Sequence, residues 1–314
     1  MSTSAPTLKK KPIKDIIATF DQRAERYLEY VAKLEGRRFT TGTSLIDDQI
    51  RGVAPGELLL LIAYSGTFKS AQLQNWMLDG AHRTKLHHLM VSLEMPNAKL
   101  FEREIQMTNQ VSGRLVESRF RGDLQQARRL MDTARMSGSQ RVITCDEPRL
   151  TLSRIEEIVH YLQDQYDGLG AVGIDYLGLI KGGESKQMVE RFAELSYGAK
   201  ELAKSCDVPV TMLGQVNRQY ASSKGVGIEL DAAKGGGDVE AAADFAIGMF
   251  TCGEDVISRI LKNRNGVAGN YYRMLIDKEA LRFCGAEPWE PPAPEDASGY
   301  GRGRRQHQTT EDPF

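Results

Sequence analysis

The sequence predicts an α/β fold, with a mostly parallel twisted sheet and helices on both of its faces. Short, mainly apolar runs recur along the chain, and each has the length of a strand buried on both faces: 58–63, 88–93, 171–177 and 208–213. Charged stretches with helical spacing separate these runs, in the order of parallel strands joined by crossover helices. The first run leads through a turn of small residues into a helix that opens on a Lys-Ser pair. Together these observations predict a phosphate-binding α/β domain.

The stretch from Glu57 to Ser70 has the features of a phosphate-binding loop, with Leu58–Ala63 as its strand. In such loops, backbone N–H groups and the helix N-terminus face the anion. The Lys meets the β- and γ-phosphates, and the next hydroxyl holds Mg²⁺. We therefore assign nucleotide phosphates and Mg²⁺ to the loop residues Ser65, Gly66, Thr67, Phe68, Lys69 and Ser70.

Phe68 departs from the usual pattern, which has Gly just before the Lys. A Cβ at this point costs strain or blocks the nucleotide, although Gly66 gives the loop freedom two residues earlier. The alternative interpretation is an ordinary strand-to-helix turn that happens to contain Lys69-Ser70.

Length and composition agree with a cytoplasmic α/β protein. A chain of 314 residues can bury a large core. It contains no signal peptide and no apolar run of membrane length, and its four cysteines have no CxxC spacing. This usage argues for a reducing compartment and against structural zinc, and the five histidines show no ligand spacing. The net charge of −1 does not exclude nucleic acid, because binding needs only a locally basic channel.

An amphipathic helix is expected over residues 12–36. Apolar residues from Ile13 to Leu34 alternate at spacings of four and three, which places them on one stripe that Gly36 ends. Such a stripe packs on its own domain or on a neighbouring subunit, and both remain open. The polar leader, residues 1–11, is expected to be disordered.

Polar side chains stand at the C-terminal ends of three predicted strands, where the ligand crevice of an open parallel sheet lies. Glu94 is placed to activate water, or it is a plain acid before the next helix. Asp175 ends an apolar strand in the Walker B arrangement, in which the carboxylate holds Mg²⁺ with Ser70. Gln215 follows the next strand.

The remaining elements fill the spaces between these strands and the end of the chain. Ser153 and Glu156 resemble a capping box that opens a helix to about Tyr166. We also expect helices in 97–138 and up to Ser205, a strand at 141–145, a late hairpin of strands at 256–261 and 271–276, and a disordered tail over 287–314.

Five short motifs occur in a fixed order on this framework: Ser92-Leu-Glu-Met-Pro96, Ile174-Asp-Tyr-Leu177 with Leu179, Leu213-Gly-Gln-Val-Asn-Arg218, Val239-Glu-Ala-Ala-Ala-Asp244 and Lys262-Asn-Arg-Asn-Gly266. With the phosphate loop, they resemble the motor domain of the DnaB-type replicative helicases of superfamily 4, over roughly residues 40–285. The resemblance implies a RecA-like P-loop NTPase over 37–286 that works as a homo-hexameric ring on single-stranded DNA.

The resemblance also implies a role for each motif residue. Lys69 contacts the β- and γ-phosphates of ATP, Glu94 orients the attacking water, and Gln215 senses the γ-phosphate. Lys262 and Arg264 act on the ATP of the adjacent subunit, with Arg264 as an arginine finger. Because that role needs an oligomer, the helix at 12–36 becomes a linker helix that docks on the neighbouring subunit.

Two loops are expected to line the ring's channel and grip DNA phosphates without reading bases. The DNA-binding candidates in these loops are Lys186, Arg218, Lys224, Lys234 and Gly235. The family has Arg-Glu-Ser-Gly where this chain has a glycine run after Lys234, and a solvated surface loop is the alternative.

Several partners and alternatives follow from the same resemblance. Only about 40 residues precede the motor, too few for the family's N-terminal helical domain, so a primase and a helicase loader are expected to act in trans, with a bacteriophage or mobile element as the source. The acidic-aromatic end, Glu311–Phe314, resembles the tip by which single-strand-binding proteins recruit partners. The alternatives are a recombinase- or clock-type RecA ATPase, and a catalytically degenerate DNA- or nucleotide-binding module.

Overall fold

The structure, a computed structural model, describes residues 17–166, 168–175, 178, 180–181, 188–215 and 241–292. The helices among these residues are α2 (Phe20–Leu34), α3 (Ser44–Ile50), α4 (Lys69–Thr84), α5 (Asn97–Asn109), α6 (Gly113–Gly122), α7 (Leu124–Met136), the 3₁₀ turn η1 (Ser139–Arg141), α8 (Leu152–Gln165) and α9 (Met188–Ser205). The strands are β1 (Leu58–Ala63), β2 (His87–Ser92), β3 (Val142–Cys145), β4 (Leu169–Asp175), β5 (Val210–Gln215), β6 (Phe245–Cys252), β7 (Asp255–Asn263), β8 (Tyr271–Asp277) and β9 (Arg282–Trp289). The chain divides into two units, residues 1–37 and 38–314.

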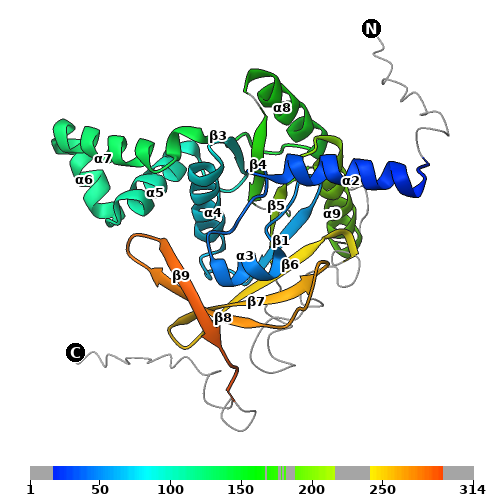
Figure 1. Cartoon of the computed structure of the whole chain (residues 1–314). Coiled ribbons are helices and arrows are strands. Elements are labelled where there is room, and N and C mark those ends of the chain that lie inside the picture. The colour runs from blue at the N-terminus through cyan, green and yellow to red at the C-terminus, as the bar shows by residue number, and fades with distance from the viewer. Residues whose placement is uncertain are drawn as a thin grey trace. The chain divides into compact units, whose positions relative to one another are not determined.

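The described strands form one sheet in the order β3-β2-β4-β5-β1-β6-β7-β8-β9. The first six in this order pair in parallel, and β6 to β9 continue as an antiparallel meander (Figure 1). The predicted α/β class with a mostly parallel sheet and late antiparallel strands is therefore confirmed.

The central strand β1 explains why helices cover both faces of the sheet. All six of its residues are buried. Leu58, Leu60 and Ile62 join a core cluster with α8 and α9, whereas Leu59 and Leu61 join a second cluster with α3 and α4. Because neighbouring side chains on a strand point to opposite faces, a wholly apolar strand must be covered on both sides.

The structure differs from the sequence-based expectations at several places. The antiparallel part is not a single hairpin, because β6 and β9 flank the two expected strands. Helix α3 was also not expected. β9 continues to Trp289, so the first residues of the expected tail from 287 belong to a strand.

The predicted capping box at Ser153 and Glu156 is wrong. Helix α8 begins at Leu152, and its N-cap is Thr151, two residues before Ser153. The Thr151 hydroxyl accepts a hydrogen bond from the Arg154 N–H. A β-branched hydroxyl residue serves as well as Ser at this position, so the pattern alone did not separate the two.

In the smaller unit, residues 17–19 are not helical and α2 begins at Phe20, later than the expected start at residue 12. The Thr19 side chain caps α2, and the Gln22 side chain accepts a hydrogen bond from the Thr19 N–H, which completes a capping box. Large apolar side chains of α2, including Tyr27 and Val31, are exposed. Residues 1–16 and 293–314, with the expected leader and most of the tail, lie outside the described residues. No helix in the described ranges is both long enough and apolar enough to cross a membrane.

Candidate nucleotide-binding site

Four neighbouring strands bring the predicted site residues to one edge of the sheet. In the order β2-β4-β5-β1, Ser92 pairs with Asp175 at one pair of strand ends, and Ala63 pairs with Gln215 at another. The phosphate loop continues from Ala63. Glu94 follows β2, and the Leu93 N–H donates to the Asp175 carbonyl over 2.7 Å. The C-terminal ends of these parallel strands therefore lie at one edge of the sheet, where an open parallel sheet binds its ligand.

The loop between β1 and α4 is closed by its own hydrogen bond. The Thr67 hydroxyl donates to the Tyr64 carbonyl over 2.6 Å, and Thr67 is buried. Gly66 has φ +84°, a left-handed conformation that suits glycine. The first turn of α4 presents N–H groups that have no acceptor within a helix, as at any helix N-terminus. These features fit an anion cradle.

Phe68 occupies a left-handed conformation at the N-cap of α4, with φ 62° and ψ 17°. A non-glycine residue there costs about 1–2 kcal/mol. The ring is partly buried and packs against the core cluster beneath α4, so apolar contact offsets part of this cost. The conformation is the one that the usual Gly adopts easily, so the Phe changes the side chain at this point while the left-handed turn persists.

Lys69, Ser70 and Asp175 lie together beneath the loop. Asp175 is fully buried, and neither carboxylate oxygen has a hydrogen-bond partner of normal geometry. Burial raises the pKa of the Asp175 carboxyl, and the nearby Ser70 hydroxyl and Lys69 ammonium lower it. A buried carboxylate without a donor is costly unless a cation offsets its charge. Oxygen ligands from Ser70 and Asp175 therefore fit Mg²⁺, which would supply positive charge beside the phosphates.

Glu94 and a further residue, Arg103, complete this edge. Glu94 is exposed, as a residue that must reach water should be. Arg103 on α5 is half-buried, and burial lowers the pKa of its guanidinium while the charges of Asp175 and Glu94 raise it. Arg103 was not predicted from the sequence, because it lies within a charged helix and only the fold brings it close to the two acids.

Lys262 and Arg264 lie at the end of β7 and just after it, away from this edge. Asp244, which is 2% exposed, accepts hydrogen bonds from Arg264 Nη1 at 2.7 Å, the Leu58 N–H at 2.8 Å and the Lys200 ammonium. The Arg264 N–H also donates to the Asp244 carbonyl. The Arg264 side chain nevertheless remains 68% exposed. It is thus anchored at one end and open to solvent.

The anchor of Arg264 is at the opposite end of β1 from the phosphate loop. Asp244 binds the N–H of Leu58, the first residue of β1, and the loop follows Ala63, the last of its six residues. At about 3.3 Å per residue, five steps separate the two ends by about 17 Å. An arginine side chain is far shorter, so with this anchor Arg264 cannot reach the phosphate loop of its own chain.

The five DNA-binding candidates, Lys186, Arg218, Lys224, Lys234 and Gly235, all lie outside the described residues. So do Tyr176, Leu177 and Leu179 of the second motif.

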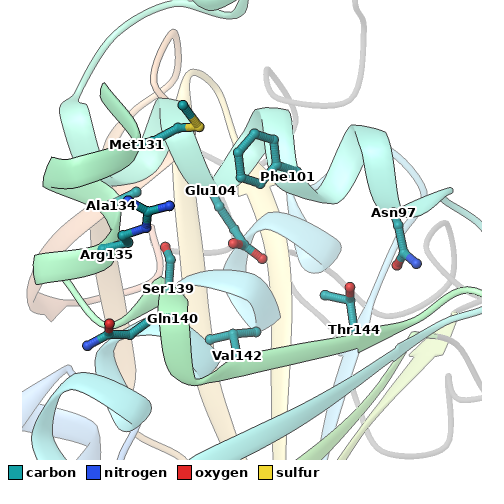
Figure 2. Close-up of a pocket in the computed structure, with 10 residues that line it drawn as sticks. All are labelled: Asn97, Phe101, Glu104, Met131, Ala134, Arg135, Ser139, Gln140, Val142 and Thr144. Atoms are coloured by element: carbon teal, nitrogen blue, oxygen red, sulfur yellow. The ribbon is translucent and has the colours of Figure 1, made fainter. Parts of the chain in front are cut away.

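A separate cavity of about 260 Å³ lies between α5, α7, η1 and β3, and contains no residue of the phosphate loop. Glu104 points into it, facing Ser139 and Val142 (Figure 2). Burial raises the pKa of the Glu104 carboxyl to about 8, so this side chain is largely protonated at neutral pH.

Comparison with known proteins adds sequence evidence to this geometry. Residues 39–284 match the family described as the DnaB-like helicase C-terminal domain. The chain is 24% identical over 250 residues to the replicative DNA helicase DnaB of Rickettsia felis, covering 76% of this chain and 49% of that protein. It is 26% identical over 267 residues to the DnaB of Treponema pallidum, covering 83% and 58%. The chain spans about half the length of these curated relatives.

Two solved structures have the same fold. A DnaB-like replicative helicase, studied with its interactions with primase, has a TM-score of 0.72 at 18% identity, covering 86% of this chain and 68% of that one. An ATPase domain has a TM-score of 0.73 at 19% identity, covering 86% of this chain and 100% of that one. The predicted RecA-like fold is confirmed by these likenesses.

Proposed function

Because the chain belongs to the family of DnaB-like helicase C-terminal domains, we propose that it is an ATP-driven motor that translocates on single-stranded DNA and separates duplex DNA during replication. The observation that carries this proposal is the buried carboxylate of Asp175 at the end of β4, close to the Ser70 hydroxyl and the Lys69 ammonium of the phosphate loop. Burial raises the pKa of this carboxyl while Ser70 and Lys69 lower it, and a bound divalent cation would stabilise the charged form further.

Each described residue has a defined part in the proposed hydrolysis. Lys69 neutralises the β- and γ-phosphates, and Ser70 with Asp175 holds Mg²⁺. Glu94 orients and activates the attacking water, and Arg103 balances the charge of the two acids. Gln215, which pairs with the last residue of β1 before the loop, reports the γ-phosphate to the segment that follows it.

The first experiment measures ATP turnover of the full chain with and without single-stranded DNA. Lys69→Ala and Asp175→Asn should abolish turnover. Lys99→Ala is the matched control, because it removes the same charge from an exposed side chain that pairs with Glu102. Zero turnover in the parent protein, equal to Lys69→Ala, would select the alternative of a catalytically degenerate binding module, in which Phe68 has abolished hydrolysis.

We further propose that Arg264, with Lys262, acts on the nucleotide of a neighbouring copy in a homo-hexameric ring. The support is the separation of about 17 Å between its anchor and its own loop, together with its exposure. Arg264→Ala lacks the finger but keeps its loop, and Lys69→Ala has the reverse defect. Each variant alone should be inactive. A mixture should regain turnover at interfaces where a subunit with an intact phosphate loop meets a subunit with an intact Arg264. Mixtures as inactive as their components would overturn action in trans.

The exposed apolar side chains of α2 support its proposed role as a linker helix that docks on the next copy. Tyr27→Ser should then lower the measured oligomer mass, whereas Glu29→Ser should not. A filament in place of a closed hexamer would favour a recombinase-type ATPase.

The finer parts of the proposal rest on family membership alone. They are 5′ to 3′ movement, cytoplasmic action in a bacterial host, and partnership with a primase, a loader or a single-strand-binding protein.

A further inference from the structure

A group of three metal-ligating side chains lies outside the proposed motor site. In the part of the chain that the structure describes, one such group brings together Glu156, His160 and Cys206, with their ligand atoms all within 4.8 Å of one another. Glu156 and His160 stand one turn apart on α8, and Cys206 follows the last residue of α9. The group therefore joins two helices that cover the same face of the sheet.

Two of the three distances between ligand atoms are close to those of a coordination sphere, and the third is at most 4.8 Å. His160 Nε2 is 3.9 Å from Cys206 Sγ and 4.0 Å from Glu156 Oε1. In a tetrahedral zinc site, the bond lengths imply about 3.6 Å between sulfur and nitrogen and about 3.3 Å between nitrogen and oxygen. The two gaps must close by about 0.3 and 0.7 Å to reach these values. The Glu156 and His160 side chains are 39% and 54% exposed, so both can rotate to close them.

We propose that Glu156, His160 and Cys206 bind a Zn²⁺-like divalent transition-metal ion, with one coordination position left for water. Thiolate, imidazole and carboxylate form a mixed soft and hard set that suits Zn²⁺, whereas Mg²⁺ requires oxygen ligands alone. Binding releases the thiol proton of Cys206 to solvent, and the resulting thiolate forms the sulfur–metal bond.

Surrounding groups hold two of the ligands in place. The Ser205 hydroxyl donates to Glu156 Oε1 over 2.6 Å, and the Gln163 side-chain amide donates to the Cys206 carbonyl over 2.7 Å. Cys206 is 4% exposed and packs in the core cluster, so its sulfur has little freedom to move away. Burial raises the pKa of the Cys206 thiol, and an adjacent metal ion offsets that penalty.

Separation along the chain hides this site from pattern searches. Glu156 and His160 have the spacing of helix neighbours, but the cysteine is 46 positions from His160 and no CxxC pair marks it. The metal would pin the end of α9 to the middle of α8. It is independent of the nucleotide site, because no residue is shared.

Cobalt titration tests the proposal on the intact, metal-depleted chain kept reduced with a phosphine. Co²⁺ at this site should give the near-ultraviolet charge-transfer band of a cobalt–thiolate bond, and Zn²⁺ should displace it. Co²⁺ at Ser70 and Asp175 gives no such band, because those ligands are oxygens. His160→Ala and Cys206→Ser should abolish the band, and Cys284→Ser, which removes an exposed thiol, should leave it intact.

The variants also separate ligation from folding. Cys206→Ser alters the core, so His160→Ala, at an exposed position, decides the case if the first variant unfolds. Zn²⁺ should raise the Tm of the parent and of Cys284→Ser, but not that of His160→Ala. Ser205→Ala removes the hydroxyl that donates to Glu156 Oε1 and lies 3.8 Å from Cys206 Sγ, and it should weaken Zn²⁺ binding about 10-fold. No thiolate band in the parent, or a band that survives in His160→Ala, overturns the proposal.

Discussion

The substitution Asp244→Asn tests which contacts of Asp244, at the start of β1, stabilise the fold and which serve only to position Arg264. Asp244 joins Lys200, Leu58 and Arg264. The Lys200 and Asp244 side chains are 13% and 2% exposed, whereas Arg264 is 68% exposed. The same carboxylate therefore makes one buried and one exposed ion pair.

The magnitudes follow from these exposures. Breaking a buried pair by removing one charge costs about 3–5 kcal/mol. Lys200 keeps a hydrogen bond to the Gly56 carbonyl at 2.7 Å, so we expect the low end, about 3 kcal/mol, for Asp244→Asn. Arg264→Ala breaks a pair that water screens on one side and should cost at most about 1 kcal/mol. In double-mutant cycles, Asp244 should couple strongly to Lys200 and weakly to Arg264.

The pH dependence gives an independent check. Burial raises the pKa of the Asp244 carboxyl, but hydrogen bonds from Lys200, Leu58 and Arg264 outweigh this and hold it below its ordinary value of 3.8. The unfolded chain therefore binds this proton first as the pH falls. The stability gap between parent and Asp244→Asn should be constant well above 3.8 and should shrink as the pH falls through the lowered pKa.

Urea unfolding followed by circular dichroism measures these differences, with ATP turnover on the same samples. Arg121→Ala is the matched control for Arg264→Ala, because it also breaks an exposed pair, with Glu117. Arg264→Ala should lose turnover while keeping nearly all of its stability. If it destabilises the chain as much as Asp244→Asn does, Arg264 is a structural side chain and the reasoning fails.

Three further variants test other parts of the structure. The Glu104 carboxyl has a folded pKa of about 8 against an ordinary 4.5, so the free energy of unfolding of the parent should fall by about 1.4 kcal/mol for each unit that the pH rises between these values. In urea unfolding at a series of pH values, Glu104→Gln should lack this slope, and parallel profiles would contradict the assignment. Phe68→Gly and Phe68→Ala both lose the ring, but only Gly suits the left-handed φ, so the Gly variant should be more stable by about 1 kcal/mol; equal unfolding midpoints would be evidence against that backbone conformation. Arg103→Gln should raise the pKa of Asp175 and move the acidic limb of the ATP-turnover profile to higher pH, and an unshifted limb would separate Arg103 from the site.

The parallel half of the fold could be predicted because its strands are short apolar runs with polar residues at their ends. β1 is six apolar residues bounded by polar ones, and both of its faces had to be covered. β6 is nearly as apolar as β1 and was missed although its first six residues are buried. β9 carries a weaker signal. β9 includes Gly285 and Pro288, and its residues are mostly half-buried, since it is the last strand of the meander.

The candidate site residues that end predicted strands could be found from the sequence. Those whose role depends on contacts between distant parts of the chain could not. Asp175 and Gln215 terminate apolar runs, so their convergence follows from parallel pairing. Arg103 lies in a helix rich in charge, and periodicity cannot tell which charge faces the acids. Likewise, Asp244 was expected only as part of a motif, and its ion pairs span 20 and 44 positions along the chain.

The position of the Asp244 network also limits how copies of this chain can assemble. The phosphate loop follows the C-terminal end of β1, and Arg264 is anchored at its N-terminal end. If Arg264 acts on a second copy, the N-terminal end of β1 in one copy must therefore lie against the C-terminal end of β1 in the other. Such a contact joins two different surfaces, and when it repeats head to tail it closes a ring or grows a filament. An antiparallel two-fold dimer also meets this end-to-end requirement, because residue i of one copy then contacts residue j of the other and j contacts i. Turnover measured together with the oligomer mass distinguishes the two arrangements: we expect turnover in rings or filaments, and an active dimer would refute the head-to-tail assembly.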